Sequence, residues 1–252
     1  MTSPPRTGPR LELKCTAPSD AVRSLVDWLG ENLRPDPHAR DPELPEIRIE
    51  SIYFDTLQRD CYRDRSRHQL PKHRVRRYDG GRAWILEEKL RVGSRVWKRR
   101  LPIEEPALVT LLDPERDSSP ISPPGLDWFR SRFRMLGLLP TLQVSYDRLA
   151  WIGPDGERVT IDRRLEVAIP RDGGRDGAAL GFAADRSRQA VPHEAIIEFK
   201  GPEEETPLLA AARAHLALPL RASSKYSLGL EAVGLEVAAA PRTTSGEGSP
   251  RR

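Results

Sequence analysis

The sequence predicts an α+β fold in which eight antiparallel strands close into a barrel and helices pack outside it. Eight segments alternate apolar and polar residues, and most of them are joined by short turns of the hairpin type. Four other segments have the residue spacing or the end signals of helices. Many polar positions of the strands are Lys, Arg or Glu at every second residue, so these strands present charged rows on one face.

The strands are expected in order along the chain, each bounded by turn residues. Gly80-Gly81 and Val92-Gly93-Ser94 are typical of hairpin turns, and residues 153–156 (GPDG) form another turn. The expected strands cover residues 10–16, 46–54, 72–78, 82–91, 95–103, 141–152, 158–162 and 194–200.

Helices are expected in four places. The first contains Val22 and Leu29 and keeps its apolar residues at a 3.6-residue period. The second and fourth open with acidic residues, which helix N-termini favour, and the third stops at Gly137. The last three cover residues 104–112, 126–136 and 203–218.

The composition fits one folded unit with loose ends. The chain has 252 residues, enough for one domain with a real core. Residues 1–9 and 238–252 have little to bury, so we expect both to be disordered and residues 10–237 to form the domain. No apolar run approaches the length of a membrane span, and the N-terminus lacks the apolar region of a signal peptide. With only two cysteines and no disulfide framework, a cytoplasmic location is expected.

The charged rows are the most informative feature. Lys72, Arg74 and Arg76 share one face of a strand, because side chains at i and i+2 point the same way. Similar rows or row positions are Arg10 with Glu12 and Lys14, Glu87 with Lys89, Lys98 with Arg100, Arg148, and Glu198 with Lys200. Charged strand faces usually meet water. When six strands carry them and helices can cover the apolar side, a closed sheet with the rows turned inward is favoured.

A lumen lined by Lys and Arg needs water, carboxylates and a polyanion, because burying unpaired like charges is costly. Between Arg63 and Arg100 the chain carries 14 Lys and Arg but four Asp and Glu, so this stretch has a strong positive excess. Nucleic acid and a phosphate chain are both candidate anions. Arg offers a planar fork and Lys a point charge, and both suit phosphate oxygens.

Nine short motifs then occur in a fixed order. They are Arg10-x-Glu12-x-Lys14, SIYFDT (51–56), KHRVRRY (72–78), EEK (87–89), KRR (98–100), YDRLA (146–150), RVTID (158–162), IEFK (197–200) and SKYSLG (224–229). Together they span nearly all of the expected domain. The sequence thus resembles the VTC domain family, the polyphosphate polymerase branch of the CYTH or triphosphate tunnel metalloenzyme superfamily.

The resemblance implies that the barrel is a triphosphate tunnel in which the γ-phosphate of ATP is transferred to a growing polyphosphate chain with the help of Mn²⁺ or Mg²⁺. It implies catalytic roles for Arg74, Arg76, Lys89 and Arg148. It implies phosphate binding by Lys14, Lys72, Lys98, Arg100, Arg158, Lys200 and Lys225. Glu198 would bind the metal, and Glu12 and Glu87 are each either a second metal ligand or a salt-bridge partner of a neighbouring cation.

Two other functions stay open. Hydrolytic and cyclase members of the superfamily begin with Glu-x-Glu-x-Lys, so Arg10 at the first position disfavours a metal-dependent triphosphatase. A non-catalytic polyphosphate-binding or nucleic-acid-binding module is the other alternative. Inward rows would exclude duplex nucleic acid by size, so we expect ATP and polyphosphate as ligands and no nucleic acid. Any membrane partner would be a separate protein, and no oligomeric state is predicted.

Five further residues have expected structural roles. Asp55 and Asp162 are expected to fix turns or hold arginine side chains rather than to bind a metal. Tyr53, Tyr78 and Tyr226 are expected in the core or in the lumen wall rather than as catalytic acids.

Overall fold

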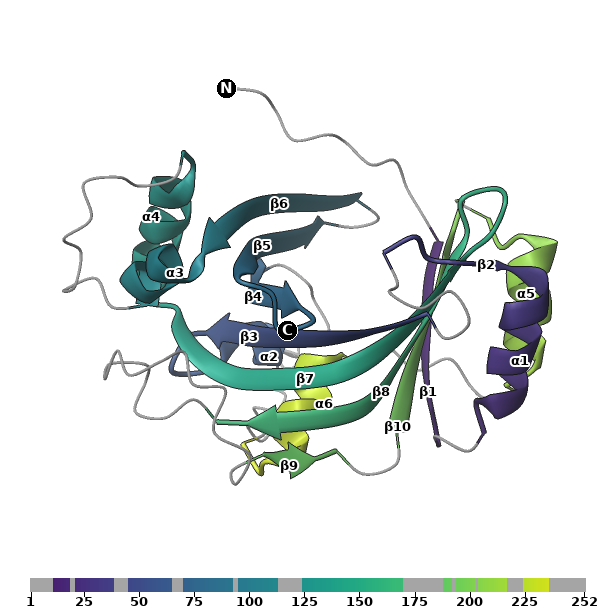
Figure 1. Ribbon diagram of the computed structural model, residues 1–252. Helices are drawn as coiled ribbons and strands as arrows, with labels where there is room; N and C mark the ends of the chain where they lie inside the picture. Colours follow the sequence, from purple (N-terminus) through teal and green to yellow (C-terminus); the bar gives the residue numbers. More distant parts are fainter. Residues whose placement is uncertain are drawn as a thin grey trace, which may run out of the picture.

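The computed structural model describes residues 11–18, 21–38, 45–64, 70–92, 95–112, 124–169, 188–191, 194–202, 204–216 and 224–235. Within them the chain forms a ten-stranded antiparallel sheet and six helices (Figure 1), so the expected α+β class is confirmed. Arg10 and the two ends expected to be disordered lie outside the described residues.

All eight expected strands are present. The strands are β1 Leu11–Pro18, β2 Arg34–Pro35, β3 Glu46–Asp55, β4 Lys72–Tyr78, β5 Ala83–Val92, β6 Arg95–Glu104, β7 Leu139–Ile152, β8 Arg158–Ala168, β9 Gln189–Ala190 and β10 Glu194–Gly201. β8 continues well past Asp162, where the expected strand ended. The two-residue strands β2 and β9 were not predicted, and they pair with β7 and β8.

The four expected helices are also present, with two more. The helices are α1 Arg23–Asn32, α2 Asp60–Arg63, α3 Glu105–Leu112, α4 Leu126–Leu136, α5 Pro207–Ala214 and α6 Lys225–Ala232. α5 begins later than expected because Thr206 caps it, accepting a hydrogen bond from the Leu209 N–H at 3.3 Å. α2 and α6 were not predicted. None of these helices combines the length and the hydropathy needed to cross a bilayer.

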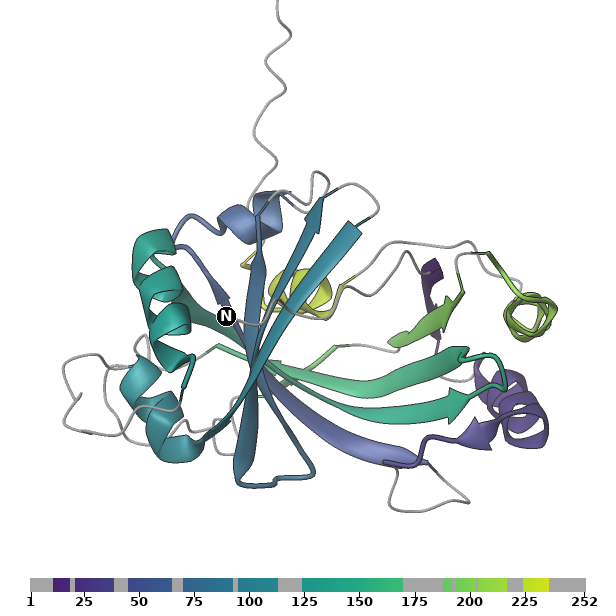
Figure 2. The same ribbon diagram turned by 90° about the horizontal axis from the view of Figure 1, so that it is seen from above.

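The main strands follow one path, β1-β10-β8-β7-β3-β4-β5-β6, with every neighbouring pair antiparallel. Among the described residues this path ends at β1 and β6, which do not pair with each other, so a barrel closed by backbone hydrogen bonds is not confirmed. The sheet is nevertheless strongly curved (Figures 1 and 2). Lys89 Nζ of β5 lies 3.6 Å from Glu12 Oε2 of β1, so side chains from near the two ends of the path meet.

Two helix pairs cover the outer face of the curved sheet. α1 and α5 contribute Leu25 and Leu209 to a core that includes Phe199 of β10. α3 and α4 contribute to a second core that includes Phe129 of α4 and Trp84 of β5. Both cores use the strand positions that alternate with the charged rows, as the sequence pattern predicts.

α6 packs on the opposite, inner face. Its residues Tyr226 and Leu230 join a third core with Ile49 of β3 and Val144 of β7. Ile49 and Ile52 are three residues apart on β3, so their side chains point to opposite faces of the sheet. Ile52 belongs to the outer core, so Ile49 and the helix α6 that packs on it lie inside the curve of the sheet. The expectation that helices pack outside the sheet is therefore wrong for α6. Gly229 permits this close packing, because α6 approaches β7 and β8 at that residue.

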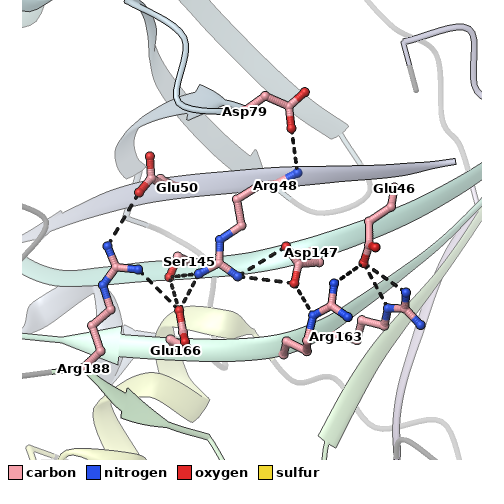
Figure 3. Close-up of polar contacts among 10 residues, drawn as sticks. Glu46, Arg48, Glu50, Asp79, Ser145, Asp147, Arg163, Glu166 and Arg188 are labelled. Carbon is pink, nitrogen blue, oxygen red and sulfur yellow. Dashed lines mark hydrogen bonds and ion pairs between the residues drawn. The ribbon is translucent and has the colours of Figure 1, made fainter. Parts of the chain in front are cut away.

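A charged network occupies another part of the outer face (Figure 3). Arg48 of β3 lies at its centre, donating to Asp147 at 3.3 Å and to Ser145 Oγ at 2.9 Å. We call the set the outer ionic belt; it comprises Glu46, Arg48, Glu50, Ser145, Asp147, Arg163, Arg164, Glu166 and Arg188. In this belt arginines are matched by carboxylates of the same chain.

Two glycine substitutions test the placement of α6. A Cβ on Gly229 would lie 2.6 Å from Leu142 Cδ2 and 2.9 Å from Val167 Cγ1, whereas a Cβ on Gly30 of α1 would meet nothing within 4 Å. We expect Gly229→Ala to lower the free energy of unfolding by about 1–3 kcal/mol through overpacking. Gly30→Ala should raise it by about 0.5–1 kcal/mol through helix propensity. Urea denaturation measures both, and a stabilising Gly229→Ala would contradict the packing of α6.

Candidate functional site

The curved sheet surrounds a cavity of about 1500 Å³. Side chains from every main strand and from the start of α6 line it, including eleven Lys and Arg against six Asp and Glu. All fourteen residues given a catalytic, phosphate-binding or metal-binding role from the sequence are among them: Glu12, Lys14, Lys72, Arg74, Arg76, Glu87, Lys89, Lys98, Arg100, Arg148, Arg158, Glu198, Lys200 and Lys225. Their individual roles stay predictions.

The strand register stacks three lysines side by side. Lys72 of β4 lies directly opposite Lys89 of β5, which lies directly opposite Lys98 of β6. Like charges in directly opposed positions are destabilising. Burial lowers the pKa of Lys89 to about 8; the attraction of Glu12 opposes this, and the charges of Lys14 and Lys98 add to it. An anion bound at this lysine row would relieve the repulsion.

The next row alternates in sign. Arg74 of β4, Glu87 of β5 and Arg100 of β6 are directly opposite one another. Glu87 accepts from Arg74 Nε at 2.5 Å and lies 2.8 Å from Arg100 Nε and 3.4 Å from Arg76 Nε. Burial alone would raise the pKa of Glu87, but the three guanidinium groups outweigh it and lower the pKa to about 2. Glu87 therefore stays ionised and holds three arginines in place.

A buried carboxylate organises cations on the other wall in the same way. Asp162 of β8 accepts two hydrogen bonds from Arg148 of β7, from Nε at 2.6 Å and from Nη2 at 2.8 Å. Lys225 of α6 also contacts Asp162. Burial would raise the pKa of Asp162, yet Arg148 and Lys225 lower it to about 2. The expectation that Asp162 holds an arginine side chain is confirmed.

Two of the three predicted metal ligands share one partner. Lys14 Nζ lies 2.7 Å from Glu12 Oε1 and 2.9 Å from Glu198 Oε1, and Lys200 Nζ lies 2.7 Å from Glu198 Oε2. Burial opposes ionisation of Glu198, but Lys200 and Lys14 outweigh it and hold the pKa of Glu198 well below its ordinary value. Glu87 instead lies among arginines.

The donors fit a hard divalent cation that takes most of its ligands from elsewhere. Among the described residues, no group of three or more His, Cys, Asp or Glu is placed to hold a metal ion. Glu12 and Glu198 are brought together at Lys14 and offer two carboxylates. Mg²⁺ and similar ions commonly bind one or two carboxylates and complete their shell with phosphate oxygens and water.

Sequence reasoning missed two features of the cavity. Part of the wall is apolar, formed by Ile47, Ile49, Ile85, Ile152 and Ile196. The sequence indicates this apolar wall only at Ile85, which lies two residues from Glu87 and therefore on the same face of the strand. Asp36, in the loop after β2, holds Arg158 Nη2 at 2.6 Å, and its loop position gave no pattern to follow. The chain has six lysines, each of which was given a role in the site from the sequence, and all six line the cavity.

The lysine row gives a pH dependence of stability. With a folded-state pKa of about 8 against an ordinary 10.5, Lys89 is neutral in the folded chain and charged in the unfolded chain between these values. The unfolded state then binds more protons, so this group makes the free energy of unfolding rise with pH from about pH 8 to pH 10.5. We expect Lys89→Met to flatten that rise in urea denaturation series. An unchanged slope would contradict the burial of this charge.

Several solved structures resemble the chain at low sequence identity. The PH1819 protein from Pyrococcus horikoshii is 17% identical, with a TM-score of 0.46 over 88% of this chain and 98% of that chain. A putative adenylyl cyclase from Hippeastrum, HpAC1, is 16% identical, with a TM-score of 0.48 over 90% and 97%. The inorganic triphosphatase NE1496 is 13% identical, with a TM-score of 0.32 over 92% and 99%.

The comparison of sequences with family models is decisive for the family. No curated protein matches the chain. The model of the VTC domain matches residues 9–233, which include every described element of the cavity wall. The chain therefore belongs to the VTC domain family.

Proposed function

We propose that this protein is an ATP-dependent polyphosphate polymerase, which transfers the γ-phosphate of ATP to the end of a growing chain inside the cavity. The observation that supports the proposal is the lining of that cavity, with eleven Lys and Arg against six Asp and Glu. Such an excess needs an anion, because unpaired like charges are costly to enclose. The volume of about 1500 Å³ is larger than an ordinary small-molecule site of about 300–1,000 Å³, which leaves room for a chain.

Phosphoryl transfer depends mostly on alignment and on neutralising charge on the phosphate oxygens. In the proposal Arg74, Arg76 and Lys89 bind the transferred group, and Glu87 keeps the two arginines oriented. Arg148 acts from the β7 wall. The attacking oxygen belongs to the terminal phosphate of the growing polyphosphate, which is already anionic near neutral pH. It forms a bond to the γ-phosphorus of ATP while the bond from that phosphorus to the β–γ bridging oxygen breaks, and ADP leaves. This nucleophile needs no general base from the protein.

In the proposal Glu198 and Glu12 would hold Mn²⁺ or Mg²⁺, and Glu87 serves as a salt-bridge partner. The cation would supply further neutralisation of phosphate oxygens. Lys14 and Lys200 contact these carboxylates, so both ammonium groups would lie near a phosphate bound at Glu12 and Glu198. The remaining predicted cations would line the route of the polyphosphate through the cavity: Lys72, Lys98, Arg100, Arg158 and Lys225.

The proposal also includes a tunnel in which the protein surrounds the polyphosphate. The ion pair between Lys89 and Glu12 supports it, because it joins side chains from near the two ends of the strand path. Both cysteines of the chain are free and buried, which suits a reducing compartment, and we propose a cytoplasmic location. A membrane partner would then be a separate protein.

Incubation with ATP and Mn²⁺ tests the proposal, with long-chain polyphosphate and free phosphate measured in parallel. We expect long-chain product from the wild type. Arg76→Ala and Lys89→Ala should each lower the rate by about 10²–10³, because each removes a charged donor to the phosphate oxygens. Arg99→Ala is the matched control, since Arg99 is exposed and stacks on Trp128. Free phosphate without any polyphosphate would favour a triphosphatase instead.

Tripolyphosphate binding tests the cavity without any reaction. At 100 times its dissociation constant the ligand should raise the free energy of unfolding by about 2.7 kcal/mol. Because every lysine lines the cavity, amine-reactive labelling followed by mass spectrometry reports on this site, apart from the N-terminal amine. Tripolyphosphate should protect the lysines, and duplex DNA should not. A flat denaturation midpoint together with unprotected lysines would count against a phosphate site.

A further inference from the structure

Asp55, the last residue of β3, is fully buried and joins three parts of the fold. Its Oδ1 accepts hydrogen bonds from the N–H groups of Thr56 at 2.8 Å and Cys61 at 2.9 Å. Its Oδ2 accepts from the N–H of Tyr62 at 3.1 Å and from the hydroxyl of Tyr226 at 2.8 Å. The three backbone contacts fix the turn into α2, as expected for Asp55. The fourth contact reaches α6, far away in the sequence.

The residue that Asp55 holds in α6 directly follows a cavity lysine. Lys225 and Tyr226 are the first two residues of the helix. Lys225 contacts Asp162, and its Nζ lies 4.6 Å from the centre of the Tyr146 ring. Neighbouring side chains on a helix are separated by a fixed rotation of about 100°. Anchoring the Tyr226 hydroxyl therefore restrains the rotation of α6, and with it the direction in which the Lys225 side chain leaves the helix.

Tyr226 also supports the wall formed by β3 and β4. Its ring stacks on that of Tyr53, with centroids 5.3 Å apart and planes 20° apart. Tyr53 lies directly opposite Arg74 in the strand register. Burial alone would raise the pKa of Tyr53, but Arg74, Lys225 and Arg76 outweigh it and lower the pKa. Tyr226 thus packs on the residue that lies opposite Arg74 in the strand pair.

We propose that Asp55 and Tyr226 are positioning residues for the phosphate site. Their hydrogen bond sets the rotation of α6, so that Lys225 of α6 and Arg74 of β4, next to Tyr53, present their charges to one bound phosphate group. In this role the Asp55 carboxylate and the Tyr226 hydroxyl bind each other and do not contact the phosphate. The proposal rests on the proposed function, since it assumes that phosphate binds at these cations.

A set of variants separates this role from simple support of the fold. Tyr226→Phe removes the hydroxyl and keeps the ring that stacks on Tyr53. Tyr62→Phe is the matched control, because the Tyr62 hydroxyl also ties α2 to α6, by donating to Glu231 at 3.3 Å. Each is made in the wild-type and in the Lys225→Ala background. The readout is the dissociation constant of tripolyphosphate by isothermal titration calorimetry, together with kcat and KM for ATP.

We expect Tyr226→Phe to weaken tripolyphosphate binding about tenfold in the wild-type background and less than about twofold in the Lys225→Ala background. Tyr62→Phe should change binding less than about twofold in both. Asp55→Asn, which keeps the shape of the side chain, should show the same dependence on Lys225. It carries the test if Tyr226→Phe does not fold.

An equal loss for Tyr226→Phe in both backgrounds would overturn the positioning role, because a merely structural effect does not depend on Lys225. If the wild type binds tripolyphosphate with the expected coupling but makes no polyphosphate from ATP, the positioning role stands and the proposed polymerase activity falls. A wild-type protein that binds no tripolyphosphate would overturn both.

Discussion

Confined positive charge is the constraint on which the rest of the structure depends. The strand register opposes Lys72, Lys89 and Lys98 directly, so this part of the sheet is assembled against electrostatic repulsion. Neighbouring rows compensate through ionised carboxylates, each shared among several cations. Glu87 and Asp162 are the two clearest cases, and both stay charged although they are buried. These carboxylates offset part of the repulsion within the sheet, and the lining of the cavity still has more Lys and Arg than Asp and Glu.

The carboxylates do more than balance charge, because they fix directions. A guanidinium held by a buried carboxylate has few orientations left, and Arg148 is held in this way by two hydrogen bonds from Asp162. Among the residues that the structure describes, the lysine row shows no such restraint beyond the long contact between Lys89 and Glu12. The cavity thus combines arginines in fixed positions with one row of lysines, Lys72, Lys89 and Lys98, that can adjust. Under the proposed function, both kinds of contact would serve a site that holds successive units of a moving polymer.

Much of this arrangement could be predicted because the information is local. The alternation of residues in the sequence specified both the strands and the face on which Arg74, Arg76 and Glu198 lie, since side chains two apart on a strand share a face. The same pattern could not decide whether the sheet closes, because curvature accumulates over many strands and has no local signature. The closed barrel expected from it is not confirmed, since β1 and β6 do not pair among the described residues. α6 was missed because it is short and its place depends on the distant contact between Tyr226 and Asp55. The contact of Asp36 with Arg158 is equally non-local.

The outer ionic belt has a consequence for how a polyanion meets the molecule. There Arg48 and its neighbouring arginines are already matched with carboxylates of the same chain, whereas the cavity has a large excess of cations. Free polyphosphate would find few vacant binding partners at the belt, and the strongest attraction would come from the mouth of the cavity. If the protein is the polyphosphate polymerase proposed above, arginines on the exterior that are already paired would limit adsorption there, and binding would be concentrated at the cavity where polyphosphate is extended.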